Sequence, residues 1–112
     1  MDRSSLRNWV IVLGTATGLI HLSLNVPFAF GEELIFTING AGYLALVALF
    51  AFTHRPAALQ WAFIGYAVAT ILGWAAIGYR VPIAYADKAI EVALVAALWQ
   101  YQHASSRAAA TA

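Results

Sequence analysis

The sequence contains no cysteine among its 112 residues, and charged residues make up only 10% of it. Without cysteine the chain cannot form a disulfide, a thiolate metal site or a CXXC haem attachment. Its net charge is only +1, and it has no basic segment typical of nucleic-acid binding. HExxH, GxSxG and phosphate-loop motifs are missing as well. We therefore expect a protein that is not an enzyme, does not bind nucleic acid and carries no cofactor.

Apolar residues are in excess, at 62% of the chain with a mean hydropathy of +0.76. A soluble domain of this size has about half apolar and about a quarter charged residues. The excess falls into four blocks, each close to the roughly 20 residues that a helix needs to cross a bilayer. These blocks are residues 9–26, 34–52, 58–77 and 83–101. We predict an all-α protein, a single domain over residues 1–112 that forms an antiparallel bundle of four transmembrane helices, with a flexible tail at 103–112.

The basic residues predict an orientation for this bundle. With four spans, one side of the membrane carries four arginines and the other side carries one arginine and one lysine. An excess of Lys and Arg marks the cytoplasmic side. We therefore expect a multi-pass protein of the cell membrane with both termini in the cytoplasm. Its expected partners are the lipid bilayer and either further copies of itself or a larger membrane complex.

A short pattern recurs in the two outer turns. Residues 26–35 (VPFAFGEELI) resemble residues 81–90 (VPIAYADKAI), and both connect an outgoing helix to a returning one. Such a match is typical of two parallel repeats related by an axis along the membrane normal. A bundle of two duplicated helical hairpins is one interpretation, and chance similarity between apolar segments is the other.

Three ionisable residues, Asp87, Lys88 and Glu91, lie inside the fourth apolar block. Charge in hydrocarbon is costly, so such residues usually face a bundle interior, pair with one another or mark a functional site. Asp87 could instead cap the helix N-terminus while Lys88 extends to the interface. Glu91 lies one turn deeper. It is either half of an ion pair with Lys88 or Arg80 that stabilises packing, or a ligand or proton site.

Small residues predict where helices pack closely. In the first block a GxxxG segment shares its face with His21 and Asn25, and such segments allow close backbone approach between membrane helices. A second ridge of small residues follows one face of the third block. The residues expected to pack against a neighbouring helix are Gly14, Gly18, Gly65, Ala69 and Gly73.

Polar residues from three blocks lie at similar distances from the outer turns. We expect them to converge in one pocket that opens outward. The candidate ligand-binding residues are His21, Asn25, Asn39, Tyr43, Asp87, Lys88 and Glu91. His21 is either a hydrogen-bonded packing residue or a ligand. A metal site between His21 and Glu91 is not expected, because three convergent ligands with known spacing are absent.

Three short motifs carry a resemblance to a known group of proteins. They are Gly18-Leu-Ile-His21-Leu, the segment NGAGYL that begins at Asn39, and Asp87-Lys88-x-x-Glu91. With these motifs the chain resembles small four-span membrane proteins of halophilic archaea and some bacteria that carry a domain of unknown function. The resemblance covers nearly the whole chain and implies a fold but no activity. Small multidrug-resistance exporters have similar length, but their first-span glutamate is absent here.

Two functions of different class remain open. The first is a structural or accessory membrane protein whose polar residues specify packing or a partner. The second is a small-molecule, ion or proton binding protein, or an oligomeric transporter, that uses Glu91 and His21.

Overall fold

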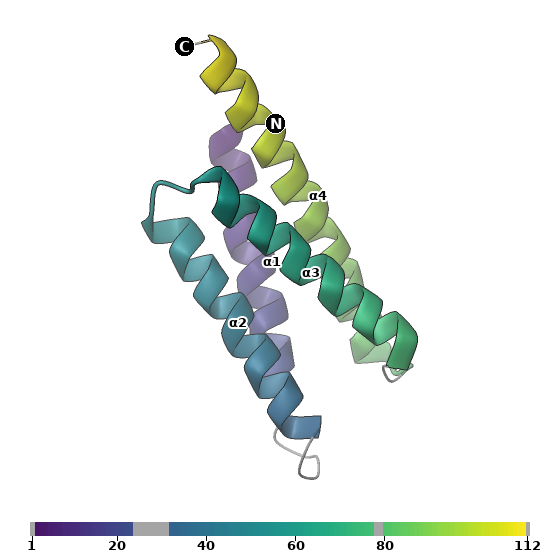
Figure 1. Cartoon of the computed structure of the whole chain (residues 1–112). Coiled ribbons are helices and arrows are strands. Elements are labelled where there is room, and N and C mark those ends of the chain that lie inside the picture. Colours follow the sequence, from purple (N-terminus) through teal and green to yellow (C-terminus); the bar gives the residue numbers. More distant parts are fainter. Residues whose placement is uncertain (1, 24–31, 78–79, 112) are drawn as a thin grey trace.

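The computed structural model describes residues 2–23, 32–77 and 80–111, and the side chains of these residues except 32–36, 77 and 109–111. These described residues form four helices, in chain order α1 (Arg3–Ser23), α2 (Glu32–Phe52), α3 (Ala57–Ile77) and α4 (Pro82–Thr111). They run antiparallel, so that α1 begins and α4 ends at the same end of the molecule (Figure 1). The prediction of an all-α four-helix bundle is confirmed. Asn25 and part of the first repeated segment lie outside the described residues.

Local sequence explains where the helices begin. The N–H of Ser5 donates to Asp2 Oδ1 at 2.8 Å, which caps α1 and holds the pKa of Asp2 below its usual range. Arg55 has a φ of 54°, a left-handed conformation that turns the chain between α2 and α3. Pro82 is the first residue of α4, a position where its missing N–H costs nothing.

The end of α4 differs from the prediction. We expected a flexible tail over 103–112, yet the helix continues to Thr111. The segment is rich in alanine, the residue with the highest helix propensity. Gln102 Nε2 also donates to Ser106 Oγ at 3.3 Å across one turn. Helix formation therefore does not stop where the apolar block stops.

Close packing of α1 against α2 depends on glycine. A Cβ atom added at Gly14 would lie 2.5 Å from Val47 Cγ2, and one at Gly18 would lie 2.9 Å from Leu44 Cδ2. One added at Gly40 would lie 2.8 Å from the carbonyl oxygen of Gly18. The GxxxG face of α1 therefore packs directly on α2.

The small residues of α3 behave differently. A Cβ added at Gly65 or Gly73 would meet nothing within 4 Å, and Ala69 is exposed. Within this chain, the prediction that these three residues pack against a neighbouring helix is wrong. The α3 helix uses its larger side chains, such as Phe63, to reach the core, and this turns the small-residue ridge outward.

The distribution of polarity is unusual for a small bundle. Among the side chains that the structure describes, seven buried ones are polar or charged, whereas the surface carries many large apolar side chains, among them Phe52 at 87% exposed. Within the described part of the chain, one segment, Ala57–Ala76 of α3, is long and apolar enough to cross a membrane by length and composition. A shorter apolar stretch, Thr37–Phe52, lies in α2. The prediction of four membrane-spanning helices thus exceeds what this criterion supports.

Candidate functional site: a buried ion cluster

The fourth helix directs Asp87, Lys88 and Glu91 into the bundle. Asp87 is 2% exposed and Glu91 is fully buried. Because α4 begins at Pro82, Asp87 lies in the second turn, too far along the helix to cap its N-terminus. The capping interpretation of Asp87 is therefore wrong.

Lys88 bridges the two carboxylates. Its Nζ donates to Asp87 Oδ2 at 3.1 Å and to Glu91 Oε1 at 2.5 Å. The Lys88 side chain is 11% exposed, so it does not extend to the interface as the alternative interpretation proposed. One ammonium group thus neutralises one of two buried negative charges.

Residues of α1 and α2 complete the hydrogen bonding of the carboxylates. Thr17 Oγ1 donates to Asp87 Oδ1 at 2.6 Å, and Tyr43 OH donates to Glu91 Oε2 at 2.6 Å. Each carboxylate oxygen therefore accepts at least one hydrogen bond, which stabilises the ionised form of both groups. We name the six residues Thr17, His21, Tyr43, Asp87, Lys88 and Glu91 the ion cluster.

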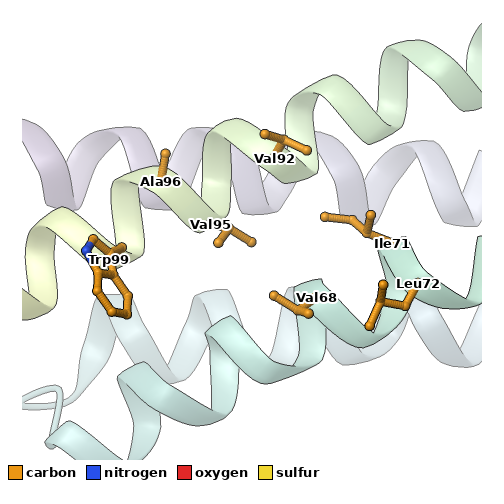
Figure 2. A pocket seen from close by; sticks show the side chains of 7 residues that line it. All are labelled: Val68, Ile71, Leu72, Val92, Val95, Ala96 and Trp99. Atoms are coloured by element: carbon orange, nitrogen blue, oxygen red, sulfur yellow. The ribbon is translucent and has the colours of Figure 1, made fainter. Parts of the chain in front are cut away.

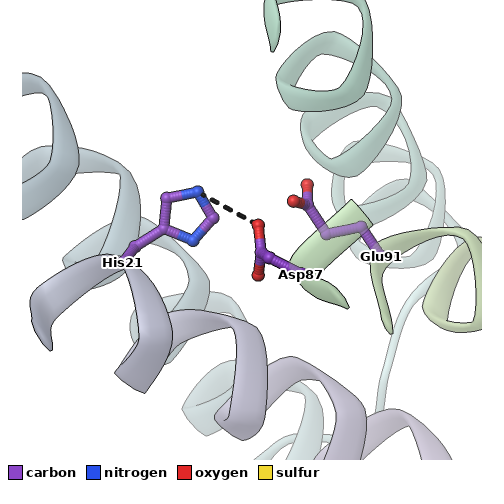
Figure 3. A group of neighbouring side chains, drawn as sticks. All are labelled: His21, Asp87 and Glu91. Carbon is purple, nitrogen blue, oxygen red and sulfur yellow. Dashed lines mark ion pairs between the residues drawn. The ribbon is translucent and has the colours of Figure 1, made fainter. Parts of the chain in front are cut away.

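The hydrogen bonds around His21 define the tautomer of its imidazole. Its Nδ1 lies 2.8 Å from the backbone carbonyl oxygen of Thr17, which can only accept a hydrogen bond. The single hydroxyl hydrogen of Thr17 is donated to Asp87. Nδ1 of His21 must therefore carry hydrogen, and Nε2 lies 3.6 Å from Asp87 Oδ2 (Figure 3).

Three groups of the ion cluster are of types that bind metals. One ligand atom each from His21, Asp87 and Glu91 lies within 4.8 Å of the other two. Three convergent groups are therefore present, and the expectation that the chain lacks them is wrong. However, the Lys88 ammonium already occupies the position between the two carboxylates. A divalent ion there would meet a positive charge at close range. The donor set therefore fits a singly charged cation or a proton better than a divalent metal ion.

Five of the candidate ligand-binding residues lie in the ion cluster, whereas Asn39 does not. The structure brings together His21, Tyr43, Asp87, Lys88 and Glu91. Asn39 lies elsewhere: its backbone oxygen accepts from Tyr66 OH at 2.8 Å, and its Oδ1 accepts from Thr70 Oγ1 at 3.4 Å.

Thr17 is the member of the ion cluster that sequence analysis missed. It precedes His21 by four residues, which places both on one face of α1. That spacing was the available signal.

Two surface grooves border α4, and neither is lined by the ion cluster. Figure 2 shows the larger, of about 430 Å³, between α3 and α4. All of its lining residues are apolar: Val68, Ile71, Leu72, Val92, Val95, Ala96 and Trp99. The second groove, of about 250 Å³, is lined by residues of α1 and α4 such as Trp9 and Gln100. Neither groove offers a polar route to the buried charges.

Comparison with known proteins does not assign the chain to a family. No protein-family model, curated protein or solved structure matches the chain.

Proposed function

We propose that this protein is a four-span integral membrane protein without catalytic activity, and that it acts as an accessory membrane subunit whose helices are held together by the ion cluster. The observation that carries the proposal is the inverted polarity of the bundle. Asp87, Lys88 and Glu91 lie inside it, and many large apolar side chains lie on its surface.

The apolar surface supports the membrane location. Ile38 and Leu72 are each 62% exposed and Val12 is 58% exposed, and these residues lie on three different helices. Soluble monomers rarely expose contiguous apolar patches larger than a few hundred Å². Hydrocarbon solvates such a surface without cost, whereas water does not.

Helix length supports the same location. The helices α1, α2 and α3 have 21 residues each, which corresponds to about 31 Å at 1.5 Å per residue. The hydrocarbon core of a bilayer is about 30 Å thick. The apolar stretch of α4 contains three charged residues, Asp87, Lys88 and Glu91, but these are buried against other helices. Their position is therefore compatible with a membrane span.

The bonding of the ion cluster supports a structural role. It joins α4 to α1 through Thr17 and His21, and α4 to α2 through Tyr43. Intramembrane charges that pair in this way typically face a bundle interior and specify its packing. Together with the apolar grooves, this arrangement favours an accessory subunit over a carrier that encloses a polar pathway by itself.

Cysteine labelling tests the topology without interference, because the chain has no native cysteine. Arg80→Cys lies between α3 and α4, and Ser106→Cys lies near the end of α4. In intact cells we expect a membrane-impermeant maleimide to label Arg80→Cys and not Ser106→Cys, which should react only after permeabilisation. Labelling of both from the same side would contradict the four-span arrangement.

The mass of the native particle tests the accessory role. After mild extraction from its native membrane, an accessory subunit should migrate with a larger complex of defined composition. A particle whose mass is an integer multiple of 12.0 kDa would instead indicate a homo-oligomer and favour the transporter alternative.

A further inference from the structure

The charges of the ion cluster do not balance. When both carboxylates are ionised, Asp87 and Glu91 contribute two negative charges and Lys88 contributes one positive charge, so the cluster carries a net charge of −1 while the imidazole of His21 is neutral. All four residues are at least nine-tenths buried. An uncompensated charge in such surroundings is costly. One additional positive charge would remove that cost.

The hydrogen bonds of the ion cluster show which atom can accept an additional proton. The Nδ1–H of His21 is directed at the Thr17 carbonyl oxygen, so Nε2 carries the lone pair that can take up a proton, and Asp87 Oδ2 lies 3.6 Å from it. A proton on Nε2 would place a positive charge 3.6 Å from the Asp87 carboxylate, and the two opposite charges would attract each other. The carboxylate oxygens, in contrast, already accept hydrogen bonds from Lys88, Thr17 and Tyr43.

We propose that the ion cluster is a binding site for one exchangeable proton, held on Nε2 of His21 beside Asp87. The proton adds to the nitrogen lone pair and no other bond breaks, so the cluster passes between net charges of −1 and 0. This inference goes beyond the accessory role. It rests on the buried cluster and not on the number of membrane spans.

The polar and charged groups near His21 come from three helices, and together they decide whether a protonated imidazole is attracted or repelled. From α4, Asp87 and Glu91 attract an imidazolium and Lys88 repels it. From α2, the Tyr43 ring lies 5.6 Å from the imidazole and is uncharged. The α1 neighbour Thr17 supplies a neutral acceptor. Among the side chains that the structure describes, the attraction from two carboxylates exceeds the repulsion from one ammonium.

The chain offers a clean spectroscopic test, because it has only three histidines. His54 and His103 lie near the opposite end of the bundle and are exposed, so His54→Gln and His103→Gln leave His21 as the single imidazole. In this background, ¹⁵N-histidine NMR of the protein in lipid nanodiscs should show one reversible protonation between pH 5 and 9. The signal of Nε2 should change, while Nδ1 keeps its hydrogen throughout.

Two variants with opposite charge changes separate proton binding from a purely structural role. Glu91→Gln makes the cluster neutral before protonation, so its titration midpoint should fall by about 1 to 3 pH units relative to the parent. Lys88→Met leaves a net charge of −2 and should move the midpoint upward by a similar amount. Tyr43→Phe is the matched control. It removes a hydrogen bond to Glu91 without changing any charge, and its midpoint should lie between the other two.

Several results would overturn the proposal. An imidazole that keeps one charge state from pH 5 to 9 in the parent would do so even if neither charge variant folds. Equal midpoints in folded Glu91→Gln and Lys88→Met would also do so. A His21 signal that responds to added Na⁺ or Zn²⁺ at constant pH would assign the site to a metal ion instead. The membrane topology is measured separately by labelling, so each proposal can fail alone.

Discussion

Removal of the positive charge of the ion cluster should destabilise the protein far more than removal of one negative charge. Lys88→Met leaves Asp87 and Glu91 facing each other without a counter-ion, with ligand atoms no more than 4.8 Å apart. At an effective dielectric constant of about 20, two like charges at this distance repel by about 3.5 kcal/mol. We therefore expect the free energy of unfolding to fall by about 3 to 5 kcal/mol, the usual cost of breaking a buried pair.

Glu91→Gln should be milder, because it leaves a balanced pair between Lys88 and Asp87 at 3.1 Å. It replaces the carboxylate by an uncharged amide, which weakens the hydrogen bonds that Tyr43 and Lys88 make to residue 91. This exchange costs about 1 to 2 kcal/mol. The charge count, and not the number of hydrogen bonds, sets the order of the two variants.

The double variant tests whether the charges of Lys88 and Glu91 act together. When Lys88→Met and Glu91→Gln are combined, only the Asp87 carboxylate remains, and His21 can neutralise it by taking up a proton. The double variant should therefore be less destabilised than the sum of the two single variants. We expect a coupling energy of about 2 to 3 kcal/mol, at the upper end of the range for residues in contact.

Unfolding in mixed micelles with increasing fractions of dodecyl sulfate, followed by circular dichroism, measures all four proteins of this cycle. The measurement belongs at neutral pH, with a repeat at pH 5, where protonation of a carboxylate should weaken the effect of Lys88→Met. A coupling energy below about 0.5 kcal/mol would mean that the residues act independently. A Glu91→Gln variant less stable than Lys88→Met would likewise refute the charge-balance argument.

Two further pairs of substitutions test the packing of the helices and the strength of two hydrogen bonds between them. Gly40→Ala should destabilise by about 1 to 3 kcal/mol, because its Cβ would lie 2.8 Å from a backbone oxygen of α1, whereas Gly73→Ala meets open space and should be neutral or stabilising by up to about 1 kcal/mol. Equal thermal melting shifts for the two would contradict the close α1–α2 contact. Tyr43→Phe removes a buried hydrogen bond to a carboxylate and should cost about 1.5 to 3 kcal/mol, against about 1 kcal/mol for Tyr66→Phe, whose partner is a backbone carbonyl. A larger loss for Tyr66→Phe in the same unfolding assay would contradict this ranking.

Much of the architecture was accessible from the sequence. Four apolar blocks separated by short polar or proline-containing turns predict four helices, because only a helix satisfies the backbone of so apolar a segment internally. The spacing of Asp87, Lys88 and Glu91 places them within one turn of each other whatever the helix packs against. The GxxxG of α1 likewise identified the face that carries His21. These features depend only on helical periodicity.

The tertiary structure decided what each face meets. Periodicity defines a stripe on a helix, but the rotation of that helix against its neighbours depends on how all four sets of side chains pack together. For this reason Asn39 faces α3 rather than the ion cluster, and Gly65 and Gly73 face outward although their pattern resembles that of α1. The hydrogen bond from Thr17 to Asp87 joins residues 70 positions apart, a distance at which no local pattern operates. The sequence by itself determined that Asp87, Lys88 and Glu91 lie within one helical turn of each other. Only the packing of α1 and α2 against α4 decided that all three enter the bundle and which groups balance their charges.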